Sequence, residues 1–203
     1  MDILGFALAV LLIELTPGPN MAWLSGLAAT EGKPAGMAAV AGVAIGLLIN
    51  GLLAALGLAA LLQVAPSLWS ALQWTGAAMM IFLAVEAWRG ARTDQPTRSA
   101  ATTKRRAFAT GAMINLLNPK AYVFFVAVAP RFMGGATLGL GNAIILAVIS
   151  ASIATIVHVV IVTTGARAQD WLADPRRMQV ARRGFALVML AVAAWFLLAD
   201  LGG

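Results

Sequence analysis

The sequence has no cysteine and a single histidine, His158, among its 203 residues. Without cysteine the chain can form no disulfide, no iron–sulfur cluster and no thiol-based redox centre. One histidine is too few for the usual zinc and transition-metal sites, which are built mainly from cysteine and histidine. Because the sequence also lacks a nucleophile elbow and a phosphate-binding glycine loop, we expect no metal, no cofactor and no enzymatic activity.

Charged side chains are also scarce, at 11% of the residues, whereas hydrophobic residues make up 61% and the mean hydropathy is +0.89. Soluble domains carry about 25% charged residues, so this composition would expose large apolar patches to water. The lipid bilayer is therefore the expected solvent. The isoelectric point near 11.1 then indicates basic loops that face anionic headgroups, and we expect no nucleic-acid partner.

Long apolar runs fill most of the chain, and a bilayer-spanning helix needs about 20 apolar residues. The first run follows Asp2, where a cleavable signal peptide would carry basic residues, so we interpret it as a transmembrane segment. We predict an all-α integral membrane protein with one transporter domain over residues 1–203 and six transmembrane helices. The predicted spans are residues 3–29, 35–62, 67–88, 107–130, 140–165 and 184–201.

Lysine and arginine are distributed unevenly over the loops between these spans. Twelve of the 14 basic residues lie in the loops that follow spans one, three and five, whereas the opposite loops contain only Arg131. The remaining one, Lys120, lies inside the fourth span. Because cytoplasmic loops are enriched in Lys and Arg, we predict that the three basic loops are cytoplasmic and that both termini lie outside.

The longest polar stretch, residues 89–106, divides the chain into two halves of three spans each, at about 1–88 and 107–203. We expect this stretch to be a mobile, basic, cytoplasmic linker. Since three is odd, the second half must cross the membrane in the opposite sense, as in transporters built from inverted repeats. The first span of each half contains a proline at a matching place, Pro19 and Pro119, which supports a repeat.

The first span is interrupted by a Thr-Pro-Gly-Pro-Asn sequence. Proline has no N–H and clashes with the carbonyl four residues earlier, so Pro17 leaves the carbonyl of Ile13 without its helical donor, and Pro19 has the same effect two residues on. Gly18 adds backbone freedom, and a new half-helix is expected to begin near Asn20. A simple kink is the alternative. We favour a functional break, because lipid tolerates freed carbonyls only against protein or a polar cavity.

The fourth span contains a second break, in which Asn115 and Asn118 precede Pro119 and Lys120. Pro119 frees the carbonyl of Asn115. Lys120 lies near the predicted membrane midplane, where a charge costs about 2.5–3.5 kcal/mol on insertion scales. A structural pairing with Glu14 or with a backbone carbonyl would explain Lys120. We favour a functional role, either as an anion hook or as a charge relay that the substrate releases.

Together the two breaks suit a zwitterionic solute. Its ammonium group could bind the freed carbonyls, Glu14 and asparagine side chains, and its carboxylate could bind at Lys120 or at the half-helix N-terminus near Asn20. The predicted substrate-binding residues are Glu14, Pro17, Gly18, Pro19, Asn20, Asn115, Asn118, Pro119 and Lys120.

Glu14 and His158 are the candidates for proton coupling. Glu14 lies one turn before the first break, near the middle of the membrane, where it could carry a proton or bind a cation. His158 lies in the fifth span, and a lone membrane histidine is either a hydrogen-bonding partner or part of a proton path. We interpret Glu86 differently, as one half of an interfacial ion pair with Arg89.

Gly42, Gly46 and Asn50 recur every four residues along the second span. Small residues at this spacing allow close helix packing in membranes, and we predict that role, with the solute cavity as the alternative environment for Asn50. The same stripe would permit a homodimer.

These motifs resemble those of the lysine-exporter and homoserine/threonine-exporter family, LysE/RhtB. The resemblance covers nearly the whole chain, and its most specific feature is a Pro-Gly-Pro followed about one hundred residues later by Asn-Pro-Lys. The other matching positions are Gly36, Gly42, Gly46, Gly76, residues 111–121, Phe124, Phe125, residues 130–132 and residues 182–184.

The resemblance implies an antiporter in the bacterial inner membrane that exports amino acids or related metabolites and is driven by the proton gradient. It also implies that the two proline motifs build the transport site. The chain departs from the family pattern at three positions. Ala84 replaces a usual glycine, Met79 a common aromatic residue, and His158 an expected acidic residue.

Other functions fit the sequence less well. A thiol-exchanging electron carrier needs paired cysteines. A metal-cation or other small-solute exporter of a neighbouring branch is the alternative that we retain, although it would favour His- or Asp-rich sites and the chain has only 8 acidic residues. A membrane scaffold would need neither two opposed breaks nor a buried Lys120.

Overall fold

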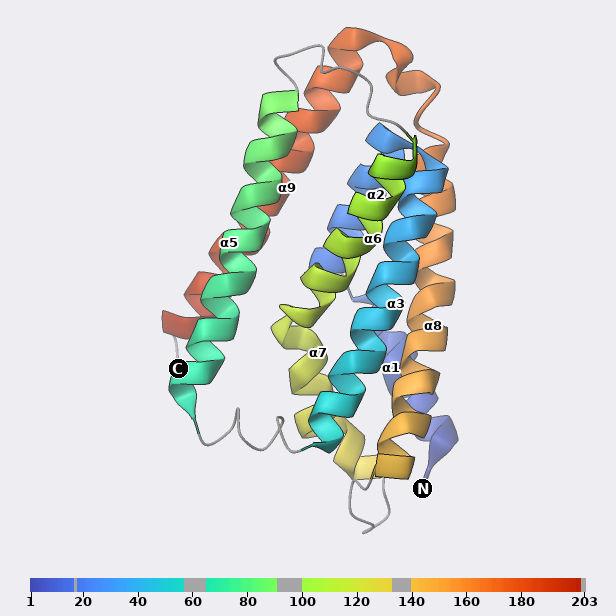
Figure 1. Ribbon diagram of the computed structural model, residues 1–203, viewed down its shortest axis with the longest axis vertical. Helices are drawn as coiled ribbons and strands as arrows, with labels where there is room; N and C mark the ends of the chain where they lie inside the picture. Colours follow the sequence, from blue (N-terminus) through green and yellow to red (C-terminus); the bar gives the residue numbers. More distant parts are fainter. Residues whose placement is uncertain (17, 57–64, 91–99, 133–139, 202–203) are drawn as a thin grey trace.

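A computed structural model describes residues 1–16, 18–56, 65–90, 100–132 and 140–201, and the regular structure in these ranges is helical. The long helices lie side by side along the longest axis of the molecule (Figure 1). The elements are α1 (Ile3–Leu15), α2 (Pro19–Glu31), α3 (Lys33–Ala55), α5 (Pro66–Gly90), α6 (Ala100–Leu116), α7 (Pro119–Val123), the π-helix η1 (Phe124–Val128), the 3₁₀ helix η2 (Ala129–Phe132), α8 (Leu140–Ala166), the 3₁₀ helix η3 (Trp171–Ala173) and α9 (Pro175–Leu201).

The described helices confirm an all-helical membrane protein. Within the described ranges, α3, α5, α8 and α9 are each long and apolar enough to cross a bilayer. A fifth span results if α1 and α2, which are bent by 57° at their break, cross as one. The predicted fourth span is not a single helix, since α6 begins with a charged segment and ends at Leu116. Neither α6 nor α7 alone can therefore span, and six spans remain a prediction.

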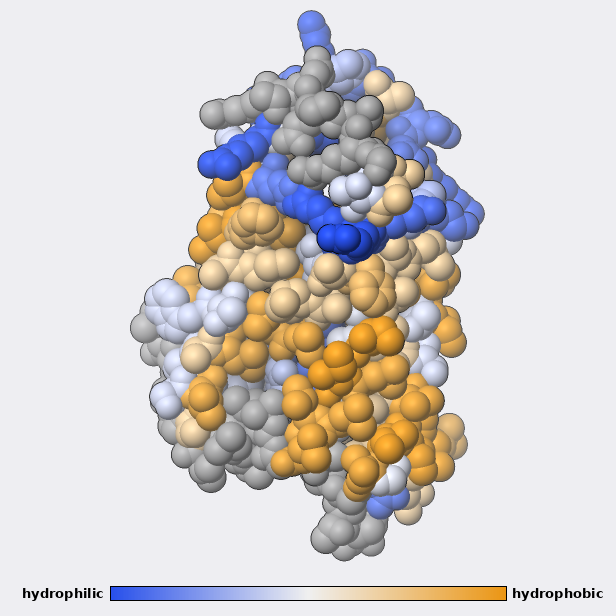
Figure 2. All heavy atoms as spheres, viewed as in Figure 1, coloured by the Kyte–Doolittle hydropathy of each residue, from blue (hydrophilic) through white to orange (hydrophobic). Residues whose placement is uncertain are grey.

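Apolar side chains cover the outside of the bundle. Leu12, Ile156 and Leu198 are 69%, 66% and 65% exposed. Figure 2 shows apolar side chains over much of one face and hydrophilic ones gathered at the end where α5 ends and α9 begins. Water would drive such a surface to associate, whereas lipid contact suits it.

The hydrophilic end, called the basic end below, holds most of the described basic residues. Met1 lies at the opposite end, and α9 runs toward that end as well (Figure 1). The helices α3, α6 and α9 begin at this end, and α5 and α8 end there (Figure 1). These helix ends and the residues next to them carry Lys33, Arg89, Lys104, Arg105, Arg106, Arg167, Arg176, Arg177, Arg182 and Arg183.

Two helices begin earlier than predicted. α6 begins at Ala100, inside the predicted linker 89–106, and α9 begins at Pro175 rather than at residue 184. Hydropathy marks where a helix enters the apolar region, but backbone hydrogen bonding continues through the charged turns beyond it. Residues 91–99 of the predicted linker lie outside the described part of the chain.

Close packing of α3 on α6 positions the second break. A Cβ atom at Gly42 would collide with the backbone carbonyl of Phe108, and one at Gly46 would lie 2.9 Å from the carbonyl oxygen of Ala112. A Cβ atom at Gly111 of α6 would collide with the backbone carbonyl of Ala39 on α3. Glycine at these contacts lets the two backbones touch. On its other side α3 packs against α8, and α5 pairs with α9.

Candidate functional site

The first break separates α1 from α2. The backbone N–H of Thr16 donates to the carbonyl of Ile13 over 3.2 Å and closes the last turn of α1. α2 then begins at Pro19, whose missing N–H is harmless at a first helical position. Pro17 lies outside the described residues.

Gly18 links the two helices in an extended conformation, with φ −159° and ψ 179°. Because any residue can adopt this conformation, the backbone freedom of glycine is not what the break requires here. A Cβ atom at Gly18 would lie 3.6 Å from the ammonium nitrogen of Lys120, which is an ordinary contact. Gly18 therefore bears on the site mainly through its position beside that ammonium group.

The second break separates α6 from α7. The backbone N–H of Asn118 donates to the carbonyl of Asn115 over 3.1 Å. The side-chain oxygen of Asn118 then accepts from the backbone N–H of Lys120 over 3.0 Å and caps α7. Pro119 occupies the first helical position. This local geometry fixes the direction in which the Lys120 side chain leaves the break.

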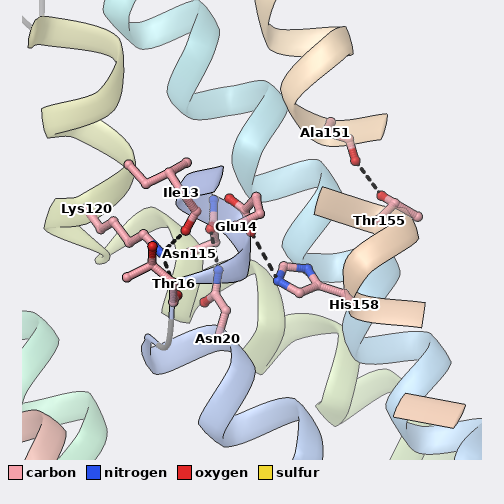
Figure 3. A network of polar contacts seen from close by, with 9 residues as sticks. All are labelled: Ile13, Glu14, Thr16, Asn20, Asn115, Lys120, Ala151, Thr155 and His158. Carbon is pink, nitrogen blue, oxygen red and sulfur yellow. Dashed lines mark hydrogen bonds and ion pairs between the residues drawn. The ribbon is translucent and has the colours of Figure 1, made fainter. Parts of the chain in front are cut away.

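Lys120 joins the two breaks (Figure 3). Its ammonium group donates to the backbone carbonyls of Ile13 over 2.6 Å and of Thr16 over 3.0 Å. The Ile13 carbonyl is the one that a proline at position 17 deprives of its helical donor. The sequence had suggested either Glu14 or a backbone carbonyl as the partner of Lys120. In the structure its hydrogen bonds go to backbone carbonyls. The negative end of the α1 dipole further favours a cation at this place.

Three buried asparagines form a second link between the breaks. The side-chain amide of Asn20 donates to the side-chain oxygen of Asn115 over 2.8 Å. The side-chain amide of Asn50 donates to the backbone carbonyl of Asn115 over 3.0 Å. That carbonyl is the one freed by Pro119. Asn50 therefore belongs to the site as well as to the contact between α3 and α6.

Glu14 and His158 face one another from α1 and α8 (Figure 3). The Oε2 atom of Glu14 lies 3.4 Å from the Nε2 atom of His158. The histidine side chain is 1% exposed and the carboxylate 17%. The sequence analysis named both residues for proton coupling but did not pair them, because they are far apart in the chain.

These groups line a central cavity of about 30 Å³. Its polar wall includes residues from both breaks and His158, and its apolar wall includes Val10, Leu47, Phe124 and Phe125. The volume corresponds to about two water molecules. A cavity of this volume is smaller than an amino acid, so binding of such a solute would require the cavity to widen.

Several polar atoms of this wall have no hydrogen-bond partner within the described ranges. They are Oδ1 of Asn20, Nδ2 of Asn115, Oγ of Ser150 and Nδ1 of His158. Buried polar groups are normally hydrogen-bonded, and an unsatisfied one costs about 1–3 kcal/mol. Because both donors and acceptors are unpaired, the wall suits a ligand that offers both kinds of group.

Ser150 was not among the predicted site residues. It shares a buried stripe of α8 with Ala154 and His158, at every fourth position. That spacing was the available signal, since a serine on the same helical face as a buried histidine indicates a polar environment.

Comparison with known proteins agrees with the predicted family. Residues 11–200 match the family model described as LysE type translocator. The homoserine/homoserine lactone efflux protein of Salmonella typhimurium is 28% identical over 191 residues, which cover 94% of this chain and 93% of that protein. An uncharacterized membrane protein of Pseudomonas aeruginosa is 32% identical over 185 residues, covering 87% and 85%.

A leucine efflux protein of Klebsiella pneumoniae is 28% identical over 139 residues, which cover 66% of this chain and 64% of that protein. No solved structure matches the chain significantly. The family model covers nearly the whole chain, including both breaks, Lys120 and His158. The chain therefore belongs to the LysE type translocator family.

Proposed function

We propose that this protein is a secondary transporter that exports amino acids, or closely related small metabolites, from the cytoplasm. The observation that carries the proposal is the Lys120 bridge, in which an ammonium group is bound by the backbone carbonyls of a helix break. An α-amino acid offers the same group. Relatives named as homoserine and leucine efflux proteins support this class of solute.

The break site offers groups for both charges of a zwitterion. The solute carboxylate pairs with Lys120 and draws it away from the carbonyls of Ile13 and Thr16. The solute ammonium group then replaces Lys120 at these carbonyls, beside Glu14. Each buried charge keeps a partner throughout this exchange, which avoids the large cost of an unpaired charge in an apolar interior.

The proposed architecture is six spans in two inverted repeats, with both termini outside the bacterial inner membrane. Two contacts support the repeat. The carbonyl freed in the first half, that of Ile13, is bound by Lys120 of the second half. The carbonyl freed in the second half, that of Asn115, is bound by Asn50 of the first. The polar end with its basic residues suits the cytoplasmic face.

We place proton coupling at the pair of Glu14 and His158. The two side chains lie 3.4 Å apart, and Lys120 is the other charged group that faces the central cavity among the described residues. A proton that binds at this pair neutralises the carboxylate and weakens its hold on the solute ammonium group. Inward proton movement would then favour release of the solute outside.

Export from intact cells tests the proposal. Bacteria that express the protein are loaded with a mixture of dipeptides, and free amino acids are measured in the medium. The controls are an empty vector, Lys120→Met, and Gly141→Ala, a position where an added Cβ meets nothing within 4 Å. Selective release by the wild type and Gly141→Ala, but not by Lys120→Met, is expected. Equal release from all four strains would reject amino-acid export.

A further inference from the structure

A second cavity lies at the basic end of the molecule, between α2, α5, α6 and α9. Its volume is about 100 Å³, compared with about 30 Å³ for the central cavity. Among the described residues, the two linings have no member in common. We call it the basic-end cavity, and none of the roles described above involves it.

Charged side chains of both signs line this cavity. Glu86 of α5 and Arg106 of α6 form an ion pair across it. Their side chains are 28% and 36% exposed, so both remain accessible. Arg182 of α9 is also in the lining and donates to the backbone carbonyl of Gly90 over 2.6 Å. This contact between helices was not among the sequence predictions, which named Arg89 as a partner of Glu86.

Apolar side chains form another part of the lining. Trp23 and Leu83 are 3% and 5% exposed, and Phe185 packs against the same cluster. A cavity with an apolar wall and a few charged groups is the usual form of a small-ligand site. The combination matches an α-amino acid with an aliphatic side chain, whose two charges lie at one end and whose apolar part lies at the other.

Helix α2 connects the two cavities. Asn20 lines the central cavity, and Trp23, one turn later on the same helix, lines the basic-end cavity. Both side chains are buried. A solute in the basic-end cavity is therefore separated from the break site by about one turn of α2, the helix that begins at the first break.

We propose that the basic-end cavity is an entry site that binds an aliphatic α-amino acid, with its carboxylate on Arg106 and its ammonium group on Glu86. This inference rests on the proposed function and adds a second binding step to it. A zwitterion can insert into an ion pair and leave neither side chain without an opposite charge. Arginine also offers two parallel N–H groups to a carboxylate.

The charge pattern predicts a selectivity that a structural ion pair would not produce. A ligand with only an ammonium group would separate the pair without offering Arg106 a carboxylate in exchange. A ligand with only a carboxylate would separate it without offering Glu86 an ammonium group. Leucine should therefore bind more tightly than leucinamide, which lacks the carboxylate, and more tightly than N-acetylleucine, which lacks the ammonium group.

Binding to the purified, full-length protein in nanodiscs tests this site. We expect Arg106→Gln to weaken the binding of leucine and of N-acetylleucine by about tenfold. Binding of leucinamide should not weaken and should tighten, because this ligand no longer has to separate the ion pair. Glu86→Gln should weaken the binding of leucine and of leucinamide by a similar factor, and binding of N-acetylleucine should tighten for the same reason. Thermal unfolding of each variant checks that it is folded. If Arg106→Gln does not fold, Arg106→Lys replaces it, because lysine keeps the charge but lacks the paired N–H groups. Arg106→Lys should weaken the binding of leucine and N-acetylleucine and not that of leucinamide.

Three results would overturn the entry site. In the first, the wild-type protein does not bind leucine. In the second, the variants bind all three ligands as tightly as the wild type does. In the third, the variants bind all three ligands more weakly by the same factor. Failure of the proposed function is a separate outcome, because it is seen as absent export from cells whatever the binding pattern. Lys120→Met should change export and leave the selectivity of the basic-end cavity intact.

Discussion

The ammonium nitrogen of Lys120 lies 2.6 Å from the backbone carbonyl oxygen of Ile13, although the two residues are 107 positions apart in the sequence. The contact joins the broken helix of one half of the chain to the broken helix of the other. Asn20 and Asn115 make a second such link. Moving the two breaks apart would therefore require both contacts to be broken.

The first prediction concerns replacement of Lys120 by methionine. The carbonyl of Ile13 keeps the backbone N–H of Thr16 as a donor, whereas the carbonyl of Thr16 loses the ammonium group of Lys120. An unsatisfied polar group that is buried costs about 1–3 kcal/mol, so the loss of stability should be no larger than that. Removal of a charge from the membrane interior offsets this by about 2.5–3.5 kcal/mol. The midpoint of thermal unfolding should therefore change little, whereas the initial rate of export should fall at least about tenfold.

Lys120→Arg is the matched control for this variant. It keeps the positive charge and several N–H donors, so it should retain more export activity than Lys120→Met at equal protein levels in the membrane. If both variants exported at the wild-type rate, the bridge would have no part in transport.

A double-mutant cycle measures the link between the two breaks. Asn20→Ala and Asn115→Ala each remove one side of a buried hydrogen bond. The double variant should therefore lose about 0.5–1.5 kcal/mol less free energy of unfolding than the sum of the two single losses. Asn50→Ala is the control, because Asn50 binds the backbone carbonyl of Asn115 and not its side chain. Asn50→Ala and Asn115→Ala should therefore be nearly additive. Strict additivity in both cycles would contradict the link through Asn20.

Close packing of α3 on α6 gives a prediction on stability. An alanine at Gly42 would force its Cβ against the backbone carbonyl of Phe108, which cannot move as a flexible side chain can. We expect Gly42→Ala to lower the free energy of unfolding by about 1–3 kcal/mol. Gly184→Ala, where an added Cβ meets nothing within 4 Å, should be neutral or slightly stabilising. Equal midpoints of unfolding for the two variants would contradict the contact.

Coupling to protons gives a fourth prediction. Export driven by an imposed pH gradient, measured at several values between about pH 5 and 8, should depend on the gradient in the wild type. Glu14→Gln cannot gain or lose a proton at this position, so its export should be insensitive to the gradient. Asp170→Asn, which changes an exposed acid at the basic end, is the control and should behave as the wild type. A gradient response that persists in Glu14→Gln would remove this residue from the coupling step.

Local chemistry made both breaks predictable from the sequence. Proline removes a donor from its own residue and a bond from a carbonyl four residues earlier, and neither effect depends on the rest of the fold. The apolar residues on both sides of Lys120 predicted that it lies inside a membrane span. Helix ends were less predictable, because α6 and α9 continue through charged turns that hydropathy assigns to loops.

The partners of the polar residues could not be predicted in the same way. The sequence suggested Glu14 as a possible partner of Lys120, but in the structure the carboxylate of Glu14 faces His158. Glu86 forms an ion pair with Arg106 of the next helix, a partner that the sequence did not suggest beside Arg89. These contacts depend on the order in which helices pack, which one sequence does not specify. A rule based on spacing within a helix finds only partners on that helix.

Efflux from reconstituted vesicles would show whether this protein exports amino acids through the Lys120 bridge. Purified protein is placed in proteoliposomes loaded with radiolabelled homoserine or leucine, a pH gradient is imposed, and loss of label is followed for the wild type and Lys120→Met. We expect the gradient to accelerate loss of at least one amino acid from wild-type vesicles, and Lys120→Met vesicles to lose label no faster than protein-free ones. Equal rates from all three kinds of vesicle would contradict amino-acid export by this bridge.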